Sequence, residues 1–332
     1  ERRDPNDYVL SELRRFAQNL VARFLGSFVV FTGTWDWPYR DVGNDVGLAM
    51  RQTSALHLIS QHPPMSDFIP GDDENHSIET AERYYDQPYL NFSGLQSGAG
   101  WTRVLYSFVN DLAAKNAIEW TQLLYNRNPH KPVINLEAIY DSSVRHDPDD
   151  PYHTEVSDLY LPRMARSSGY WSVLSGSAGY SFGCGLIFSW GPRAVAPQGG
   201  NWPWHVAMNQ PSSFEMQYLY EFFTTYEWWR LVPCNDLILS QQSVQWINHM
   251  VLSKTDDGDL AIAYLPDNPE IEIDMSAFDT ILAATWFDPI NNVYQAGDAA
   301  VAPIGSYTFQ KPVGWQDAVL LLETTAPPVM TT

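Results

Sequence analysis

Amphipathic helices that lead into short, strongly apolar strands are the sequence feature that most constrains this fold. Residues 8–25 carry apolar side chains at helical spacing and end at Gly26. Residues 27–32 follow at once as an apolar run that contains β-branched side chains. Such a run is typical of a strand buried on both faces, as in a parallel sheet covered by helices. The start of the chain therefore predicts an α/β fold.

The same alternation recurs through residue 238. Four further strands are predicted, at 56–60, 89–96, 132–137 and 178–183. Three further helices are predicted, at 104–127, 163–176 and 213–229. Strands that alternate with helices and end in polar residues are typical of a (β/α)8 TIM-type barrel, whose active site lies at the carboxyl ends of its strands. Only five barrel strands can be identified, although closure requires eight.

The pattern changes after residue 238, where short alternating segments separated by turn clusters replace the helices. This pattern is typical of an antiparallel β-sandwich. We therefore predict a barrel domain over 1–238 and a β-sandwich domain over 239–332. The acidic turn Asp256–Asp259 lacks the ligand spacing of an EF-hand loop, so a plain hairpin is favoured over a calcium site.

Composition and motifs exclude several classes of function. The 332 residues include 39 Asp and Glu against 19 Lys and Arg, and the formal charge of −20 would repel nucleic acid and anionic membranes. No apolar run approaches the roughly 18 residues of a membrane-spanning helix. Cys184 and Cys234 are too few for a zinc site, and no dinucleotide or phosphate-binding fingerprint occurs, so we expect neither metal nor cofactor. Whether these two cysteines form a disulfide stays open. The sequons at Asn75 and Asn91 favour a secreted protein.

Two carboxylates follow predicted strands at the positions where a barrel carries its chemistry. Asp36 lies at the exit of the first strand and Glu137 at the exit of the fourth. Glycoside hydrolysis on a barrel commonly uses such a pair, in which one group protonates the leaving oxygen and the other attacks or activates water. Asp36 could instead cap a helix or form an ion pair. A Glu within an apolar strand needs a partner, and burial there raises the pKa of a carboxyl group.

Other side chains near the predicted strand ends suit a sugar-binding cleft. The polar candidates are Gln61, His62 and Gln96, although His62 could equally be a structural histidine. Trp35, Tyr140 and Trp190 offer flat apolar faces on which sugar C–H groups stack. A serine hydrolase is disfavoured because the Gly-x-Ser-x-Gly nucleophile elbow is absent.

Several stretches resemble the apiosidase-like glycoside hydrolases, barrel enzymes followed by a small β-sandwich named a collagen-binding domain. The matching stretches are His57–Pro63, Gly94–Gly98, Lys131–Tyr140, Arg166 with Tyr170–Gly183, Trp228–Pro233, Ala284–Pro289 and Gly314–Leu322. The resemblance implies a retaining mechanism on furanosides of the apiose or arabinofuranose type. It makes Glu137 the nucleophile and Asp36 the acid/base, with Asp41 and Asp45 as substitutes because Gly33-Thr34-Trp35-Asp36 is one residue longer than the family's Gly-Gly-Asp ending.

The resemblance also implies that the first visible strand is barrel strand four, so this chain carries strands four to eight. Two uncovered sheet edges would be an aggregation hazard. We therefore expect a second chain that supplies the missing strands, namely the N-terminal part of the same precursor, or a homo-oligomer that covers the edges. The alternative to an enzyme is a non-catalytic carbohydrate- or protein-binding protein that keeps the barrel as a scaffold.

Overall fold

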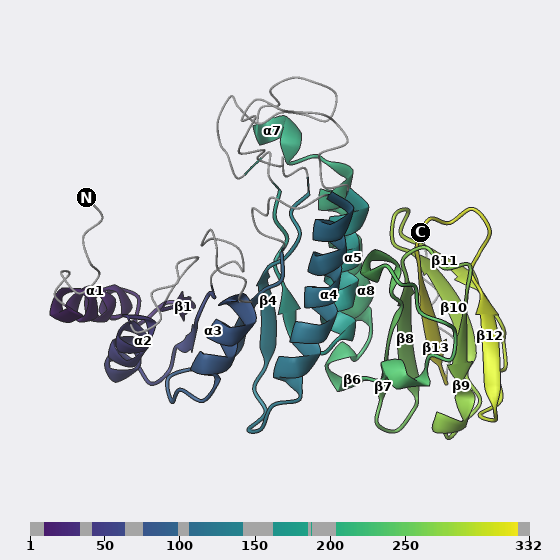
Figure 1. The fold of residues 1–332 in the computed structure, drawn as a ribbon, viewed down its shortest axis with the longest axis horizontal. Coiled ribbons are helices and arrows are strands. Elements are labelled where there is room, and N and C mark those ends of the chain that lie inside the picture. Colours follow the sequence, from purple (N-terminus) through teal and green to yellow (C-terminus); the bar gives the residue numbers. More distant parts are fainter. Residues whose placement is uncertain are drawn as a thin grey trace.

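Parallel strands with helices occupy one end of the molecule, and antiparallel sheets occupy the other (Figure 1). The computed structural model describes residues 10–33, 42–63, 76–98, 106–141, 162–184, 187 and 204–324. The predicted mixed α/β fold with a C-terminal antiparallel domain is confirmed.

Five short parallel strands follow one another through the first part of the chain. They are β1 (Val30–Thr32), β2 (Leu58–Ser60), β3 (Ser93–Gln96), β4 (Val133–Glu137) and β5 (Gly179–Tyr180). β1 pairs with β2, while β3, β4 and β5 form a separate sheet in that order. The Asn91 amide donates to the Ile59 carbonyl oxygen at 2.9 Å and thereby joins the two sheets. The strands consequently lie side by side in chain order.

Helices pack against one face of these strands. They are α1 (Leu10–Arg23), α2 (Val42–Thr53), α3 (His76–Tyr85), α4 (Tyr106–Tyr125) and α5 (Pro162–Leu174). Two further helices follow, α7 (Trp204–Ala207), which lies away from the strands in Figure 1, and α8 (Pro211–Thr225), which packs against α5. Phe31 of β1 and Ile59 of β2 are buried in one cluster with Val21 of α1. Leu95 of β3 packs with Trp120 of α4. Phe31, Ile59 and Leu95 of the first three strands therefore face the helices.

The expectation that the first strand is buried on both faces is wrong. Phe31 is buried, but its neighbour Val30 is 54% exposed. On β2, Leu58 is likewise 50% exposed beside the fully buried Ile59. Within the described ranges the helices cover only one face of β1 and β2, so the side chains on the other face remain exposed.

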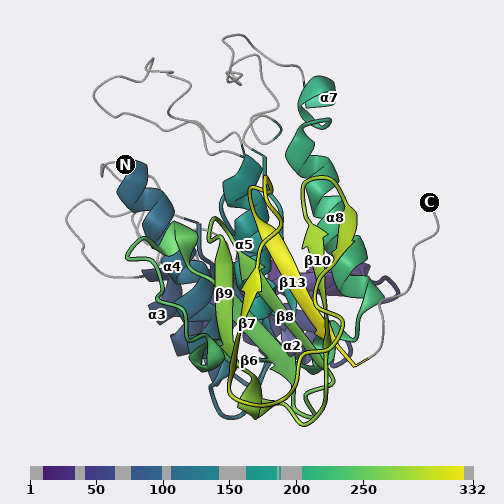
Figure 2. The ribbon, with the colours of Figure 1, turned by 90° about the vertical axis from the view of Figure 1, so that its right-hand side faces the viewer.

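The antiparallel part consists of a six-stranded sheet and a two-stranded sheet (Figure 2). The larger sheet contains, in spatial order, β11 (Val293–Ala296), β10 (Ala283–Asp288), β13 (Ala318–Glu323), β8 (Leu260–Leu265), β7 (Val251–Thr255) and β6 (Leu231–Pro233). The smaller sheet pairs β12 (Ser306–Gln310) with β9 (Glu270–Asp274). Short 3-10 turns accompany these strands at η3 (Trp228–Arg230), η4 (Asn235–Leu237), η5 (Trp246–Asn248) and η6 (Met275–Ala277). β6 lies upstream of the division at 238/239, which stays a prediction.

Several local expectations have clear outcomes. The acidic segment Asp256–Asp259 connects the antiparallel strands β7 and β8, so the predicted hairpin is confirmed. Cys184 and Cys234 do not form a disulfide. Among the described residues, no helix combines the length and apolarity needed to cross a membrane.

Candidate active site

Glu137 is the last residue of β4, and a bulge decides which way it faces. Val133 and Asn135 of the same strand are fully buried, and Val133 packs with α4. Strict alternation would place Glu137 on that helix-covered face. Leu95 pairs with Asn135 whereas the next residue, Gln96, pairs with Glu137, so β4 contains one extra residue. The bulge turns Glu137 to the face opposite the helices.

The side chain of Asn135 holds this bulge. It is fully buried, and one amide orientation satisfies every neighbour. In that orientation the NH2 group donates to the carbonyl oxygens of Leu95 and Glu137, each at 3.2 Å. The amide oxygen accepts from the hydroxyls of Ser97 at 2.7 Å and Ser172 at 2.9 Å. Asn135 therefore ties the carbonyl of Glu137 to β3 and α5.

His62 lies beside the Glu137 carboxylate. Its Nε2 is 3.4 Å from Oε2 of Glu137, and the two side chains are 19% and 18% exposed. Its Nδ1 lies 3.2 Å from the Pro63 carbonyl oxygen, which can only accept a hydrogen bond. A protonated His62 could donate from Nδ1 to Pro63 and from Nε2 to an ionised Glu137.

The glutamine before His62 faces the opposite way. Gln61 is buried, and its Nε2 donates to the Gly43 carbonyl oxygen at 3.0 Å and to the Tyr89 hydroxyl at 2.9 Å. Tyr89 in turn donates to Asn44 at 2.9 Å. These bonds join β2 to α2, and a contact between Gln61 and substrate stays a prediction.

Gln96 and Tyr140 flank Glu137 along the same edge. Gln96 is buried and pairs with Glu137 in the backbone register. Tyr140 is half-buried, and its ring covers Gly183, where a Cβ atom would come within 2.3 Å of the ring. Gly183 is therefore needed for Tyr140 to lie in this position.

Asp141 is a buried carboxylate that the sequence reasoning missed. It has no exposed surface, and its backbone N–H donates to the Gly183 carbonyl oxygen at 2.9 Å. Its carboxylate accepts a hydrogen bond from the Ser212 hydroxyl in the first turn of α8. Burial, and secondarily Asp141, raises the pKa of Tyr180 above its usual range. The one available sequence signal was a second acid four residues after Glu137.

Two family models together match nearly the whole chain. The apiosidase-like catalytic domain matches residues 3–230. The collagen-binding domain of a collagenase matches residues 232–323. The chain belongs to the apiosidase-like glycoside hydrolase family. This result confirms the resemblance seen in the sequence and the expectation of a glycoside hydrolase.

Solved structures similar to this apiosidase-like chain agree on the fold. A glycoside hydrolase matches with a TM-score of 0.76 and 19% identity over 96% of this chain and 70% of its own. A family 5 glycoside hydrolase from Bacteroides vulgatus matches with a TM-score of 0.75 and 19% identity over 95% of this chain and 66% of its own. This chain thus spans about two thirds of the length of both. A comparison with curated proteins finds no match.

Three of the predicted site residues of this apiosidase-like chain lie outside the described residues. They are Asp36, the candidate acid/base, and the aromatic candidates Trp35 and Trp190. The described residues do bring together His62 and Glu137, with Gln96 and Tyr140 at the same strand ends. In the part of the chain that the structure describes, no group of three or more potential metal ligands occurs.

Proposed function

We propose that this chain is the main part of a secreted retaining glycosidase that cleaves furanosides, with Glu137 as the nucleophile and Asp36 as the acid/base. The observation that carries the proposal is the bulge in β4, which turns Glu137 toward His62 at the carboxyl ends of the parallel strands. Carboxyl ends of parallel strands are where α/β enzymes carry their catalytic groups.

The proposed reaction has two steps. In the first, Asp36 donates a proton to the glycosidic oxygen while Oε of Glu137 attacks the anomeric carbon, which breaks the glycosidic bond and forms a glycosyl ester. In the second, Asp36 removes a proton from water, whose oxygen attacks the anomeric carbon and releases Glu137 as a carboxylate. A protonated His62 at 3.4 Å would favour the ionised Glu137 that attack requires. The sugars we propose are apiose or arabinofuranose in plant-type polysaccharides or glycosides.

A panel of aryl furanosides tests this assignment. We expect Glu137→Gln to lower kcat/KM by about 10⁴-fold, because it removes the attacking oxygen without changing the size of the side chain. Glu119→Gln is the matched control, since Glu119 lies on the exposed side of α4 and forms an ion pair with Lys115. If turnover is unchanged in Glu137→Gln, the assignment of Glu137 as the nucleophile is wrong.

A covalent trap gives a second readout. A 2-deoxy-2-fluoro furanosyl fluoride should add one glycosyl mass to the peptide that contains Glu137, because the slow second step lets the ester accumulate. A label on another carboxylate would reassign the nucleophile. These tests should use material that includes every co-purifying chain. If that material binds sugar but shows neither turnover nor a label, the alternative of a non-catalytic carbohydrate-binding protein is favoured.

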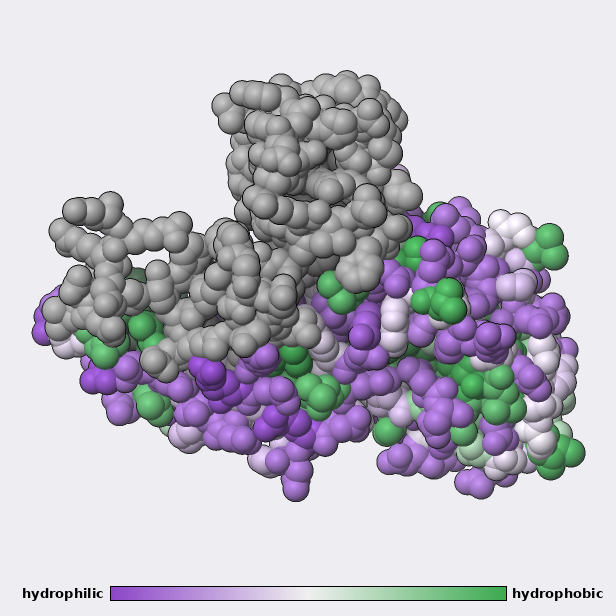
Figure 3. Space-filling view, viewed as in Figure 1, coloured by the Kyte–Doolittle hydropathy of each residue, from purple (hydrophilic) through white to green (hydrophobic). Residues whose placement is uncertain are grey.

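We extend the proposal to a partner that completes the parallel strands. At the β1 end, large apolar side chains are exposed: Phe28 fully, Leu56 at 90%, Val30 at 54% and Leu58 at 50%. Figure 3 shows hydrophobic residues on the surface at this end of the molecule. An open strand edge with an apolar face is an interaction site or an aggregation hazard.

The opposite edge of the parallel strands, formed by β5, is also open among the described residues. Within the described residues β5 pairs only with β4. A cavity of about 340 Å³ lies beside β5, between α5 and α8, and is lined by apolar side chains such as Val173, Leu219 and Phe223. One polypeptide with further strand–helix units would cover both ends. The two similar structures contain chain without a counterpart here, which is consistent with such a segment from the same precursor.

Mass spectrometry of the purified native protein tests the partner. We expect a complex of this 37.7 kDa chain with one different, non-covalently bound polypeptide. Complexes that contain only copies of this chain would contradict a partner from the same precursor and favour a homo-oligomer. A soluble, active 37.7 kDa monomer would contradict both the precursor partner and the homo-oligomer. Recovery of the protein from the culture medium tests secretion.

A further inference from the structure

The central strands of the antiparallel domain have no free face for a ligand. All six residues of β8 are buried, as are the first five of β13. Ile262 and Tyr264 of β8 lie in a core that includes Tyr170 of α5 and Phe222 of α8. The alternating residues, such as Ala263, lie in a second core with β9 and β12. The sheet is thus packed on one side against the parallel-strand part, as Figure 1 also shows.

A buried ion cluster crosses this interface. Arg166 of α5 is 1% exposed, and its Nε and Nη2 donate to the two carboxylate oxygens of Asp317 at 2.8 and 2.9 Å. Its Nη1 donates to Glu215 of α8 at 2.5 Å. The hydroxyl of Tyr264 donates to Asp317 at 2.7 Å. Burial alone would lower the pKa of Arg166, but Asp317 together with Tyr264 and Glu215 outweighs burial and raises the pKa.

The cluster continues along α8 toward the candidate active site. Glu215 and Ser212 are three residues apart on α8, so they lie on one face of the helix. Ser212 donates to Asp141, which follows Glu137 by four residues. Between these two acids, Ala138 and Ile139 are buried. The first turn of α8 therefore links the polar contacts of the antiparallel domain to those of the segment that begins with Glu137.

We propose that the antiparallel domain positions the candidate nucleophile through the buried contacts of Asp317, Arg166, Glu215, Ser212 and Asp141. The domain then acts as a structural part of the active site and not as an independent binding module. Backbone bonds hold the segment at both ends: Gly98 donates to the Glu137 carbonyl oxygen at 3.1 Å, and Asp141 donates to Gly183. Ser212 and Asp141 are positioning residues, and the inference rests on Glu137 being the nucleophile.

Hydrogen exchange tests the inference without requiring activity. We expect Asp317→Asn to speed exchange of the Asp141 amide by about tenfold or more, because the link that orders this segment is loosened. Ser212→Ala should do the same while leaving the buried arginine cluster intact, and it keeps the test valid if Asp317→Asn does not fold. Asp257→Asn, in the exposed hairpin of the same domain, is the control. Unchanged exchange at Asp141 in Ser212→Ala would overturn the inference.

Kinetics on the furanoside panel separate positioning from folding. Ser212→Ala should lower kcat about tenfold with KM nearly unchanged, because a displaced carboxylate weakens attack more than binding. Ser212→Thr, which keeps the hydroxyl, should restore most of the rate. If the unaltered protein is inactive on every furanoside, the proposed function fails while the exchange test still decides the inference. If it is active and Ser212→Ala has unchanged kcat, the inference alone fails.

Discussion

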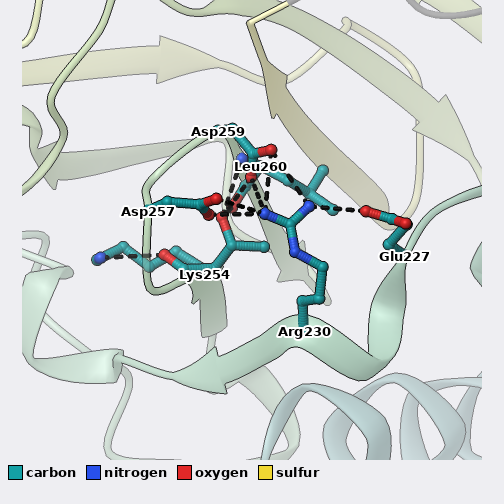
Figure 4. Close-up of polar contacts among 7 residues, drawn as sticks. Glu227, Arg230, Lys254, Asp257, Asp259 and Leu260 are labelled. Atoms are coloured by element: carbon teal, nitrogen blue, oxygen red, sulfur yellow. Dashed lines mark hydrogen bonds and ion pairs between the residues drawn. The ribbon is translucent and has the colours of Figure 1, made fainter.

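Two arginines bind carboxylates of the antiparallel domain, in opposite environments. Arg166 is 1% exposed and binds Asp317 and Glu215. Arg230 of η3 has 30% of its side chain exposed and binds Glu227, Asp257 and Asp259, as Figure 4 shows. Both bind their carboxylates at hydrogen-bonding distance.

The difference between the clusters lies in what water can do after a contact is lost. Around Arg230, water can solvate each freed group, so an exposed ion pair adds little stability. Around Arg166, water has no access, and removal of one partner leaves an uncompensated buried charge. Similar contacts are therefore expected to differ several-fold in their contribution to the free energy of unfolding.

The largest effect is expected from Arg166→Met. This change leaves Asp317 and Glu215 buried without their counter-charge and should lower the free energy of unfolding by about 3–5 kcal/mol. Denaturant unfolding followed by tryptophan fluorescence measures it. Arg166→Met with Glu215→Gln and Asp317→Asn should recover part of the loss, because the carboxylates become neutral. A loss no larger than that of Arg230→Met would remove the distinction between the clusters.

An intermediate effect is expected at Glu323, an interface carboxylate for which no arginine partner occurs among the described residues. Burial raises its pKa from 4.5 to about 7, and its Oε2 is buried without a hydrogen-bond partner in the described structure. The folded state thus retains a proton that the unfolded state loses. Its contribution to stability is complete below pH 4.5 and is lost as the pH rises through 7.

Glu323→Gln tests this contribution. The variant should be more stable than the unaltered protein at pH 8 by about 1–2 kcal/mol, after allowance for partial solvent exposure. At pH 4 the two should unfold at nearly the same denaturant concentration. Glu270→Gln, on an exposed residue of β9, serves as a control. Equal stabilities of Glu323→Gln and the unaltered protein at both pH values would contradict the raised pKa.

The smallest effect is expected from Arg230→Met. Its carboxylate partners are exposed or half-exposed and can be hydrated, so the unfolding temperature should hardly change. The small remaining difference should shrink further in 0.5 M NaCl, because salt screens exposed charges. If differential scanning calorimetry shows a large fall in unfolding temperature that does not depend on salt, this cluster behaves as a buried one.

Sequence reasoning was most successful where neighbouring residues decide the structure. The helix predicted at 8–25 is α1 at Leu10–Arg23, and the strand predicted at 132–137 is β4 at Val133–Glu137. Both carry strong hydrophobic periodicity or β-branched apolar runs. The segment at Val42–Thr53 forms α2 but was not predicted. Its buried face consists mostly of the small residues Gly43, Gly47 and Ala49, and its helix depends on packing against α1.

The candidate site was predicted in part. Glu137 could be chosen because a carboxylate in an apolar strand is costly without a function or a partner. The contact between Glu137 and His62 could not be predicted, because alternation alone would place Glu137 on the helix-covered face. Asp141 also escaped prediction, since its partner Ser212 lies 71 residues away in the sequence.

The sequence by itself determined the alternation of helices and strands, the change to antiparallel strands and the membership of the apiosidase-like family, because these depend on local patterns. Only the tertiary structure decided that a one-residue bulge turns Glu137 toward His62 and that Arg166 meets Asp317 across 151 residues. Such contacts depend on how whole elements pack together. No short stretch of sequence contains that information.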